Sequence, residues 1–600
     1  MNDSTHLFHI PVMGTGFTID TPLRVAKYGI SSVIPLVDDV LVEQVRKFHC
    51  EKHGEPYEEI SNSNQDARAL RITAYLNLVD RLVQQQVVTL QASPFEEGSD
   101  ITRYFEMLPE TPLKQAYNEM LKITDGAAKA RMQADLRQQA VPGSIDVNIM
   151  TKLDRDIYLN GNKLAAEFSD AMAALRGFAN STLNSSVVFS AGINQKLYTY
   201  AATFEDFFPD KNGELKKKII LKVSDYRSAS VQGRFLAKRG LWVSEYRIES
   251  GLNCGGHAFA TDGYLLGPVL EEFKEKRQEL IETLHATYNK ALTDRGWTVS
   301  REPHEVSLTV QGGIGTAVEN EFLLRYYAVD RTGWGTPFLL VPEVTNVDEI
   351  HLEKLLAATD GDVYLSGSSP LGIPFWNLRT SASEETRRQH IREGKPGSRC
   401  VKGAARLNTE FTNIPICPAS RAYIKRKLQH LAEEGLSIER LAAVKQSVLS
   451  KSCICHDLGG GTALKYGIDP AATPSICCGP GIRDFTKIST LEEMVAHIYG
   501  WRSLINNKDR SHMFIRELML YIDHLRQESK NFSLKLSFRA PGYFHKFKEN
   551  LLSGIEYYQR LAGQFMEEQR SQFLAALEVL LDELDTIVLP EGCARVECNE

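Results

Sequence analysis

The chain lacks the features that would mark a membrane, secreted or nucleic-acid-binding protein. It contains no apolar run of roughly eighteen residues, so no membrane-spanning helix is predicted. The first residues, Met1 to His6, show no basic stretch followed by an apolar one, which argues against a signal peptide. Its 69 basic and 76 acidic residues give a net charge of −7, which does not favour nucleic acid or an anionic membrane as a partner. We therefore expect a cytoplasmic protein.

Cysteine is scarce in the first two thirds of the chain. Of the 10 cysteines, only Cys50 and Cys254 precede Cys400. In a cytoplasmic protein we expect cysteines to be reduced or bound to metal rather than paired in disulfides. Their crowding after Cys400 predicts a second functional region near the C-terminus.

Short apolar segments bounded by glycine alternate with helical ones as far as residue 380. Such segments are typical of parallel strands buried on both faces. Eight of them with intervening helices predict an α/β fold, a (β/α)8 TIM barrel. A doubly wound sheet is the rival, but it would place its glycine turn after the first strand rather than the seventh and eighth. The eight expected strands span residues 8–13, 31–37, 144–149, 186–190, 218–223, 241–246, 306–310 and 328–334.

Two other stretches have a helical pattern. Residues 40–140 are long, charged and helical in period, which is too much for a connecting loop and predicts a helical insertion. From residue 382 amphipathic helices predominate, and their apolar faces are compatible with a homodimer. The predicted division is a barrel over 1–39 and 141–381, the insertion over 40–140, and a cysteine-containing, mainly α-helical C-terminal region over 382–600.

Glycine turns follow the seventh and eighth predicted strands, where TIM barrels bind phosphate groups. One is Gln311 to Thr316 and the other is Gly333 to Thr336. A single glycine turn is usually structural, but two on successive strands expose backbone N–H groups to one phosphate. Behind the sixth strand, Gly255 and Gly256 precede His257, whose imidazole titrates near neutrality. Together they predict a phosphorylated cofactor beside an acid–base group.

The order of these motifs resembles the nitronate monooxygenase-like family of FMN-binding barrels, which includes 2-nitropropane dioxygenases and FMN-dependent enoyl-carrier-protein reductases. The resemblance covers only the barrel strands, over residues 7–37 and 143–343. The family's sixth-strand signature, Gln-Gly-x-Glu-Ala-Gly-Gly-His, matches Ser250 to His257 without gaps. Ser250, Asn253 and Cys254 replace its glutamine, glutamate and alanine, so the substrate cannot be carried over. The resemblance assigns FMN binding to Met13, Gly14, Asn148, Lys222, Gly255, Gly256, Gly312, Gly313, Gly335 and Thr336.

The resemblance implies an FMN-dependent oxidoreductase that moves a hydride to or from a carbon next to an activating group. The substrate would be a small molecule or an acyl thioester, such as a nitronate or an enoyl thioester. His257 would exchange a proton beside the flavin; the alternative is that it only caps its loop. Lys222 would hold the phosphate or the flavin, or else be a solvated strand end. A reductase would need NAD(P)H or an electron-transfer partner, whereas a monooxygenase would need dioxygen.

Six cysteines in the C-terminal region allow a metal site. Four of them would suffice for an iron–sulfur cluster, which could exchange single electrons with a flavin. Zinc is the second choice, because Cys-x-Cys and Cys-Cys are not the usual spacings of zinc ligands. Reduced cysteines that merely pack are the alternative. The rival from another class is a catalytically inactive, metal-binding interaction protein on a barrel scaffold. The candidate ligands are Cys400, Cys417, Cys453, Cys455, Cys477 and Cys478.

Overall fold

The computed structural model describes residues 5–159, 162–190, 192–253, 261–505, 507, 510–537, 539–565 and 567–590. Parallel strands close into a barrel in the order β1-β10-β9-β8-β7-β6-β3-β2. The predicted (β/α)8 barrel with additional helices is thereby confirmed. The barrel strands are β1 (Phe8–Ile10), β2 (Ser31–Pro35), β3 (Ile145–Ile149), β6 (Ser185–Phe189), β7 (Lys217–Val223), β8 (Val243–Glu249), β9 (Ser307–Gln311) and β10 (Arg331–Gly333).

The strands are buried on both faces because side chains fill the barrel and helices surround it. Every residue of β2, β3, β6 and β9 is buried. The sixth strand is longer than predicted, since β8 continues past Tyr246 to Glu249 and brings a carboxylate to the C-terminal end of the barrel. The helices of the barrel are α1 (Pro22–Val25), α7 (Asp170–Ala179), α8 (Gln195–Ala201), α9 (Tyr226–Ala237), α10 (Leu266–Asp294), α11 (Ala317–Tyr326) and α12 (Glu349–Leu356), with a 3-10 turn η5 (Thr336–Leu340).

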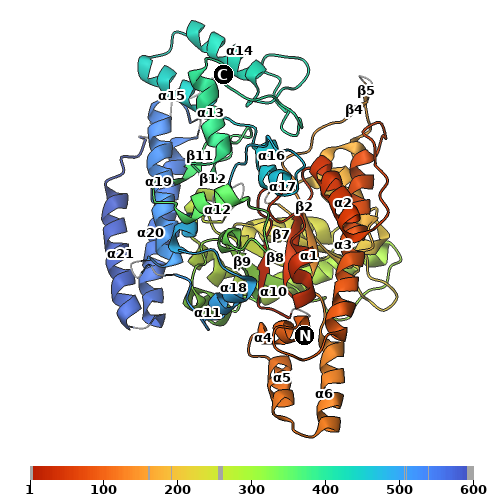
Figure 1. The fold of residues 1–600 in the computed structure, drawn as a ribbon. Helices are drawn as coiled ribbons and strands as arrows, with labels where there is room; N and C mark the ends of the chain where they lie inside the picture. Colours follow the sequence, from red (N-terminus) through yellow and green to blue (C-terminus); the bar gives the residue numbers. More distant parts are fainter. Residues whose placement is uncertain are drawn as a thin grey trace.

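The region between β2 and β3 is helical, as its period predicts. In Figure 1, α4 to α6 project beyond the end of the barrel where the N-terminus lies. Residues 112–139 form two helices, because Asp125 caps a new helix by accepting the N–H of Ala128. The helices are α2 (Asp39–His53), α3 (Ala67–Ala92), α4 (Asp100–Glu106), α5 (Pro112–Lys122) and α6 (Gly126–Gln139).

The chain after the barrel wraps two sides of it. In Figure 1, α19, α20 and α21 run side by side along one flank, whereas α13 to α17 lie towards the C-terminal ends of the strands. A short antiparallel ribbon, β11 (Val363–Ser366) with β12 (Phe375–Leu378), precedes these helices, and a smaller one, β4 (Tyr158–Leu159) with β5 (Asn162–Lys163), follows β3. The helices are α13 (Ala382–Arg392), α14 (Arg421–Glu433), α15 (Ile438–Leu449), α16 (Ile454–Asp457), α17 (Gly460–Lys465), α18 (Leu491–Ile498), α19 (Met513–Ser533), α20 (Pro541–Leu561) and α21 (Glu567–Asp585).

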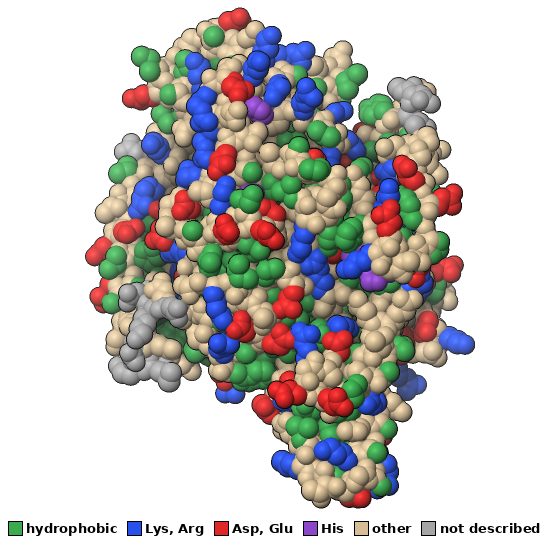
Figure 2. Space-filling view, in the orientation of Figure 1, with side chains coloured by type: hydrophobic (Ala, Val, Ile, Leu, Met, Phe, Trp, Pro, Cys, Tyr) green, Lys and Arg blue, Asp and Glu red, His purple; other side chains and the backbone are tan. Residues whose placement is uncertain are grey.

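The surface carries charges of both signs. On the face shown in Figure 2, acidic and basic side chains are interspersed, in keeping with the small net charge. Among the described residues, no helix is long and apolar enough to cross a membrane.

Candidate active site

A carboxylate at the C-terminal end of β8 gathers three polar side chains. Oε1 of Glu249 lies 2.8 Å from Nζ of Lys222 on β7 and accepts hydrogen bonds from Gln311 (2.7 Å) and Asn253 (2.6 Å). These side chains are largely enclosed, with Gln311 only 1% exposed. The lysine compensates the charge and the two amides fix the orientation of the carboxylate. This cluster, Lys222–Glu249–Gln311–Asn253, is called the mouth network below.

A second lysine stands next to the mouth network. Burial lowers the pKa of Lys152, which follows β3, and the charge of Lys222 lowers it further while Glu249 opposes this. Lys222 thus pairs directly with Glu249, whereas Lys152 is influenced by the charges of both. Sequence reasoning found Lys222 but missed Lys152, Glu249 and the role of Gln311. The available signal was their position: each is a polar residue at or just beyond the end of a barrel strand, where TIM barrels carry functional groups.

The glycine turns after β9 and β10 meet at one small cavity of about 30 Å³, which we call the glycine cavity. Gly312 and Gly313 have φ angles of +105° and +82°, which favour glycine. A Cβ atom at Gly312 would lie 2.8 Å from the backbone N of Asn253, and one at Gly313 would lie 2.6 Å from Cδ1 of Leu252. The structure thus brings the predicted phosphate-binding residues Gly312, Gly313, Gly335 and Thr336 together around this cavity.

The N-terminus of α11, directly after the first glycine turn, already has an anionic partner. Glu319 accepts the N–H groups of Gly315 (2.9 Å) and Thr316 (3.2 Å). Burial favours the neutral acid, but the neighbouring Arg510 outweighs it and lowers the pKa of Glu319 to about 2. Arg510 also donates to the carbonyl of Gly313 at 3.0 Å. A phosphate at this end would therefore depend on the backbone of the glycine cavity rather than on the helix terminus.

The C-terminal region covers two of the predicted cofactor-binding positions. The hydroxyl of Thr336 accepts the N–H of Gly479 at 3.0 Å, and Gly481 lines the glycine cavity. Met13 is fully buried. Gly14 has a φ of +56°, and a Cβ there would lie 3.2 Å from the carbonyl O of Leu458, in the turn after α16.

Asn148 has an unsatisfied acceptor inside the barrel. It pairs in register with Val188, which belongs to the cluster of apolar side chains that fills the barrel. The side chain of Asn148 is buried, and its Oδ1 has no hydrogen-bond partner among the described residues. A buried orphan acceptor costs about 1–3 kcal/mol. A ligand N–H would remove this cost.

His257, the predicted acid–base residue, lies outside the described residues together with Cys254, Gly255 and Gly256. The described chain ends at Asn253 on one side of this segment and resumes at Thr261 on the other. The assigned roles of these residues stay predictions.

The six cysteines predicted as metal ligands lie in two different places. Cys400, Cys417 and Cys455 pack in one cluster with Leu153 and Ala419, and a hydrogen bond from the Cys417 thiol lowers the pKa of Cys400. Burial, together with the nearby Asp457, Cys455 and Cys400, raises the pKa of Cys453 to about 12. Cys477 and Cys478 are buried in the main core instead. Within the described part of the chain, no group of three or more His, Cys, Asp or Glu side chains is arranged to hold a metal ion.

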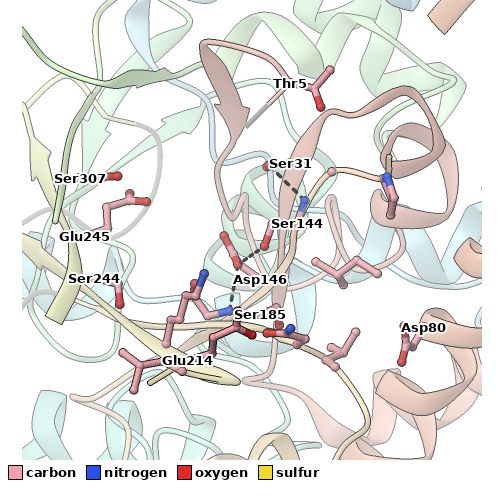
Figure 3. A pocket seen from close by; sticks show the side chains of 18 of the residues that line it. Thr5, Ser31, Asp80, Ser144, Asp146, Ser185, Glu214, Ser244, Glu245 and Ser307 are labelled. Atoms are coloured by element: carbon pink, nitrogen blue, oxygen red, sulfur yellow. Dashed lines mark hydrogen bonds between the residues drawn. The ribbon is translucent and has the colours of Figure 1, made fainter. Parts of the chain in front are cut away.

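A larger cavity of about 870 Å³ lies at the N-terminal end of the barrel (Figure 3). Serine hydroxyls from several strands surround Asp146, which accepts hydrogen bonds from Ser144 (2.6 Å) and from the N–H of Ser186 (3.1 Å). Burial raises the pKa of Asp146, although Arg247 opposes the shift. Catalysis in TIM barrels belongs to the opposite end, so this cavity is not the candidate active site.

Comparison with known proteins gives similar solved structures but no match of sequence or family. No protein-family model matches the chain, and no curated protein matches its sequence. Among solved structures, it is similar to the enoyl reductase domain of MlnA from the macrolactin biosynthesis cluster of Bacillus amyloliquefaciens, with 13% identity over 75% of this chain and 88% of that chain. The TM-score of 0.30 is too low to support an argument about function. The functional argument therefore rests on this chain's own residues.

Proposed function

We propose that the protein is an FMN-dependent oxidoreductase whose substrate reacts at a carbon next to an activating group, such as an enoyl thioester or a nitronate. The observation that carries the proposal is the position of the glycine cavity directly beside the mouth network, at the end of the barrel where TIM-barrel enzymes place their active sites. Asn253 belongs to both, because it lines the cavity and donates to Glu249.

The residues present fit a phosphorylated flavin in two respects. The backbone of Gly312 and Gly313, where side chains are excluded, offers a close approach to a phosphate. The unsatisfied Oδ1 of Asn148 offers an acceptor for a ring N–H. FMN, when bound, supplies the hydride chemistry.

Side chains of this protein would bind and orient the cofactor and substrate, and one of them would move a proton. Lys222 and Lys152 would hold negative charge at the mouth, with Glu249 fixing Lys222 in place. His257 would donate or accept the proton that accompanies hydride transfer. The helices after residue 382 would exclude water and shape the substrate entrance. Two of their contacts support this role: Thr462 on α17 donates to the carbonyl of Gly16 at 2.8 Å, and the carbonyl of Leu458, after α16, lies against Gly14 in the turn after β1.

The absorption spectrum of the purified protein tests the proposal. Flavin bands near roughly 370 and 450 nm, present on purification or after adding FMN, are expected. A protein that neither contains nor takes up FMN would sink the proposal. Anaerobic reduction by NADH or NADPH, followed by mixing with an enoyl thioester or with oxygen, would then separate a reductase from a monooxygenase.

The same spectrum tests the iron–sulfur cluster proposed from the sequence as an additional centre, for which Cys400, Cys417 and Cys455, packed in one cluster, would be the first candidate ligands. A shoulder near roughly 400–420 nm that dithionite bleaches, together with stoichiometric iron, is the expected sign. Metal without flavin would instead support the rival, a metal-binding interaction protein.

A further inference from the structure

A buried carboxylate from the C-terminal region joins two separate points of the barrel. Glu517 on α19 is 1% exposed. Its Oε1 accepts the hydroxyl of Ser250, directly after β8, at 2.6 Å, and its Oε2 accepts the N–H of Leu266, the first residue of α10, at 2.8 Å. The backbone of Gly251 also lies close enough to oppose the rise in the pKa of this carboxyl group. One side chain therefore fixes both the end of the sixth barrel strand and the start of the helix that follows.

The turn that Glu517 holds, residues 250–253, forms one wall of the glycine cavity. The hydroxyl of Ser250 accepts the N–H of Leu252 at 3.2 Å, and the carbonyl of Ser250 accepts the N–H of Asn253 at 3.1 Å. Leu252 and Asn253 are the residues against which Gly313 and Gly312 pack, with no room for a Cβ. A displacement of a few tenths of an ångström at Ser250 would therefore reach the cavity.

The same turn is linked to the mouth network. Asn253 donates to Glu249, which holds Lys222. On its other side, the carbonyl of Gly251 accepts the indole N–H of Trp376 at 3.2 Å. With these contacts, the position of the turn depends on groups from β12 and α19 as well as from the barrel.

Glu517 has no cationic partner among the described residues, and burial raises its pKa to about 7. Tyr558 on α20 is the titratable side chain that faces it, and its hydroxyl accepts the N–H of Gly267 at 3.1 Å. A buried carboxyl group without a cationic partner lowers the stability of the folded state unless its hydrogen bonds compensate for the lost hydration. Here they satisfy two donors, the hydroxyl of Ser250 and the N–H of Leu266, that would otherwise be buried and unpaired.

We infer that Glu517 is a positioning residue for the cofactor site: through Ser250 it sets the 250–253 turn, and so the shape of the glycine cavity that would receive the FMN phosphate. The inference rests on the proposed function for its ligand. The geometric part, in which Glu517 holds the 250–253 turn, is independent of that function because all the contacts lie within this chain.

The test compares FMN dissociation constants, measured by quenching of flavin fluorescence, for the full-length protein and five variants. Glu517→Gln keeps the acceptor and can donate to Ser250, so its affinity should stay within about threefold of the original. Glu517→Ala leaves the donors of Ser250 and Leu266 unpaired and should weaken FMN binding by about tenfold or more. Ser250→Ala should weaken FMN binding less than Glu517→Ala does. The double variant should bind FMN only slightly more weakly than Glu517→Ala alone, because both substitutions act on one turn.

Glu43→Ala is the matched control, since Glu43 is 6% exposed and bonded to Arg46 on α2, away from the glycine cavity. It should lower thermal stability without changing FMN affinity. If Glu517→Ala binds FMN as tightly as the original protein, or if Glu43→Ala weakens binding equally, the positioning role is wrong.

Hydrogen exchange keeps the inference testable if the original protein binds no FMN and the proposed function fails. Glu517→Ala should raise amide exchange at residues 250–253 and 312–316, while Glu517→Gln and Glu43→Ala should leave these amides protected. Unchanged exchange there in Glu517→Ala would overturn the positioning role independently of any flavin.

Discussion

Lys222 and Glu249 form an ion pair of 2.8 Å between the ends of two adjacent barrel strands. Their side chains are only 11% and 15% exposed, so little water screens the pair. Glu249 also binds two amides, which means that its charge is fixed in place whether or not Lys222 is present. Lys222 is thus held at the barrel mouth as a cation with a defined position.

We predict that Lys222→Met lowers stability by roughly 1–3 kcal/mol, because it leaves the enclosed Glu249 without its direct ion-pair partner. The double variant Lys222→Met with Glu249→Gln should regain most of this stability but not FMN affinity, since only the lysine would contact the ligand. Urea unfolding and FMN titration measure the two effects. The exposed pair Lys276–Glu272 is the control, and breaking it should change stability by at most about 0.5 kcal/mol.

Gly313 and Gly213 offer a matched pair of alanine substitutions. Both have a φ of +82°, so alanine is equally strained at either position, at a cost of about 1–2 kcal/mol. A Cβ at Gly213 meets nothing within 4 Å, whereas one at Gly313 meets Leu252 at 2.6 Å. Gly313→Ala should therefore cost about 1 kcal/mol more and weaken FMN binding, while Gly213→Ala should leave binding unchanged. Equal binding by both variants would remove the glycine cavity from the cofactor site.

The barrel was predictable because most of its strands are local apolar runs, several of them followed by glycine, a pattern that a single sequence displays. The convergence of Gly312, Gly313, Gly335 and Thr336 followed from strand order alone. The contact between Ser250 and Glu517 could not be predicted in this way. The two residues are 267 positions apart, and a buried glutamate on an amphipathic helix has the same local pattern as an exposed one. Only the packing of α19 against the barrel distinguishes them.

The raised pKa of Glu517 predicts a pH dependence of stability. Burial raises this pKa to about 7 from its ordinary value of 4.5, so the unfolded chain releases the proton at lower pH than the folded protein. Between these two pH values the folded state binds more protons than the unfolded chain. The contribution of Glu517 to stability therefore falls as pH rises from about 4.5 and is lost above about 7. A shift of this size corresponds to about 3 kcal/mol.

Glu517→Gln should therefore be more stable relative to the original protein at pH 8 than at pH 5, by up to about 3 kcal/mol in urea unfolding. Glu319→Gln is the control. Arg510 lowers the pKa of Glu319 to about 2, so this carboxyl group stays ionised across the window in the folded state. Its substitution should lower stability by nearly the same amount at both pH values. An equal offset at both pH values for Glu517→Gln would contradict the prediction.

His257→Ala tests the proposed acid–base role. Because the cofactor would be held by the glycine cavity and the mouth network, the variant should still bind FMN with nearly the original affinity. Turnover should fall by roughly 10²–10⁴-fold, the usual contribution of a positioned proton donor. Stopped-flow measurement of the hydride-transfer step separates this from slower product release. His430, which pairs with Glu434 on the surface, is the control, and His430→Ala should be as active as the original protein. If His257→Ala retains full turnover, the proton must come from another group at the barrel mouth, and Lys152, next to Lys222 and with a lowered pKa, is the next residue to substitute.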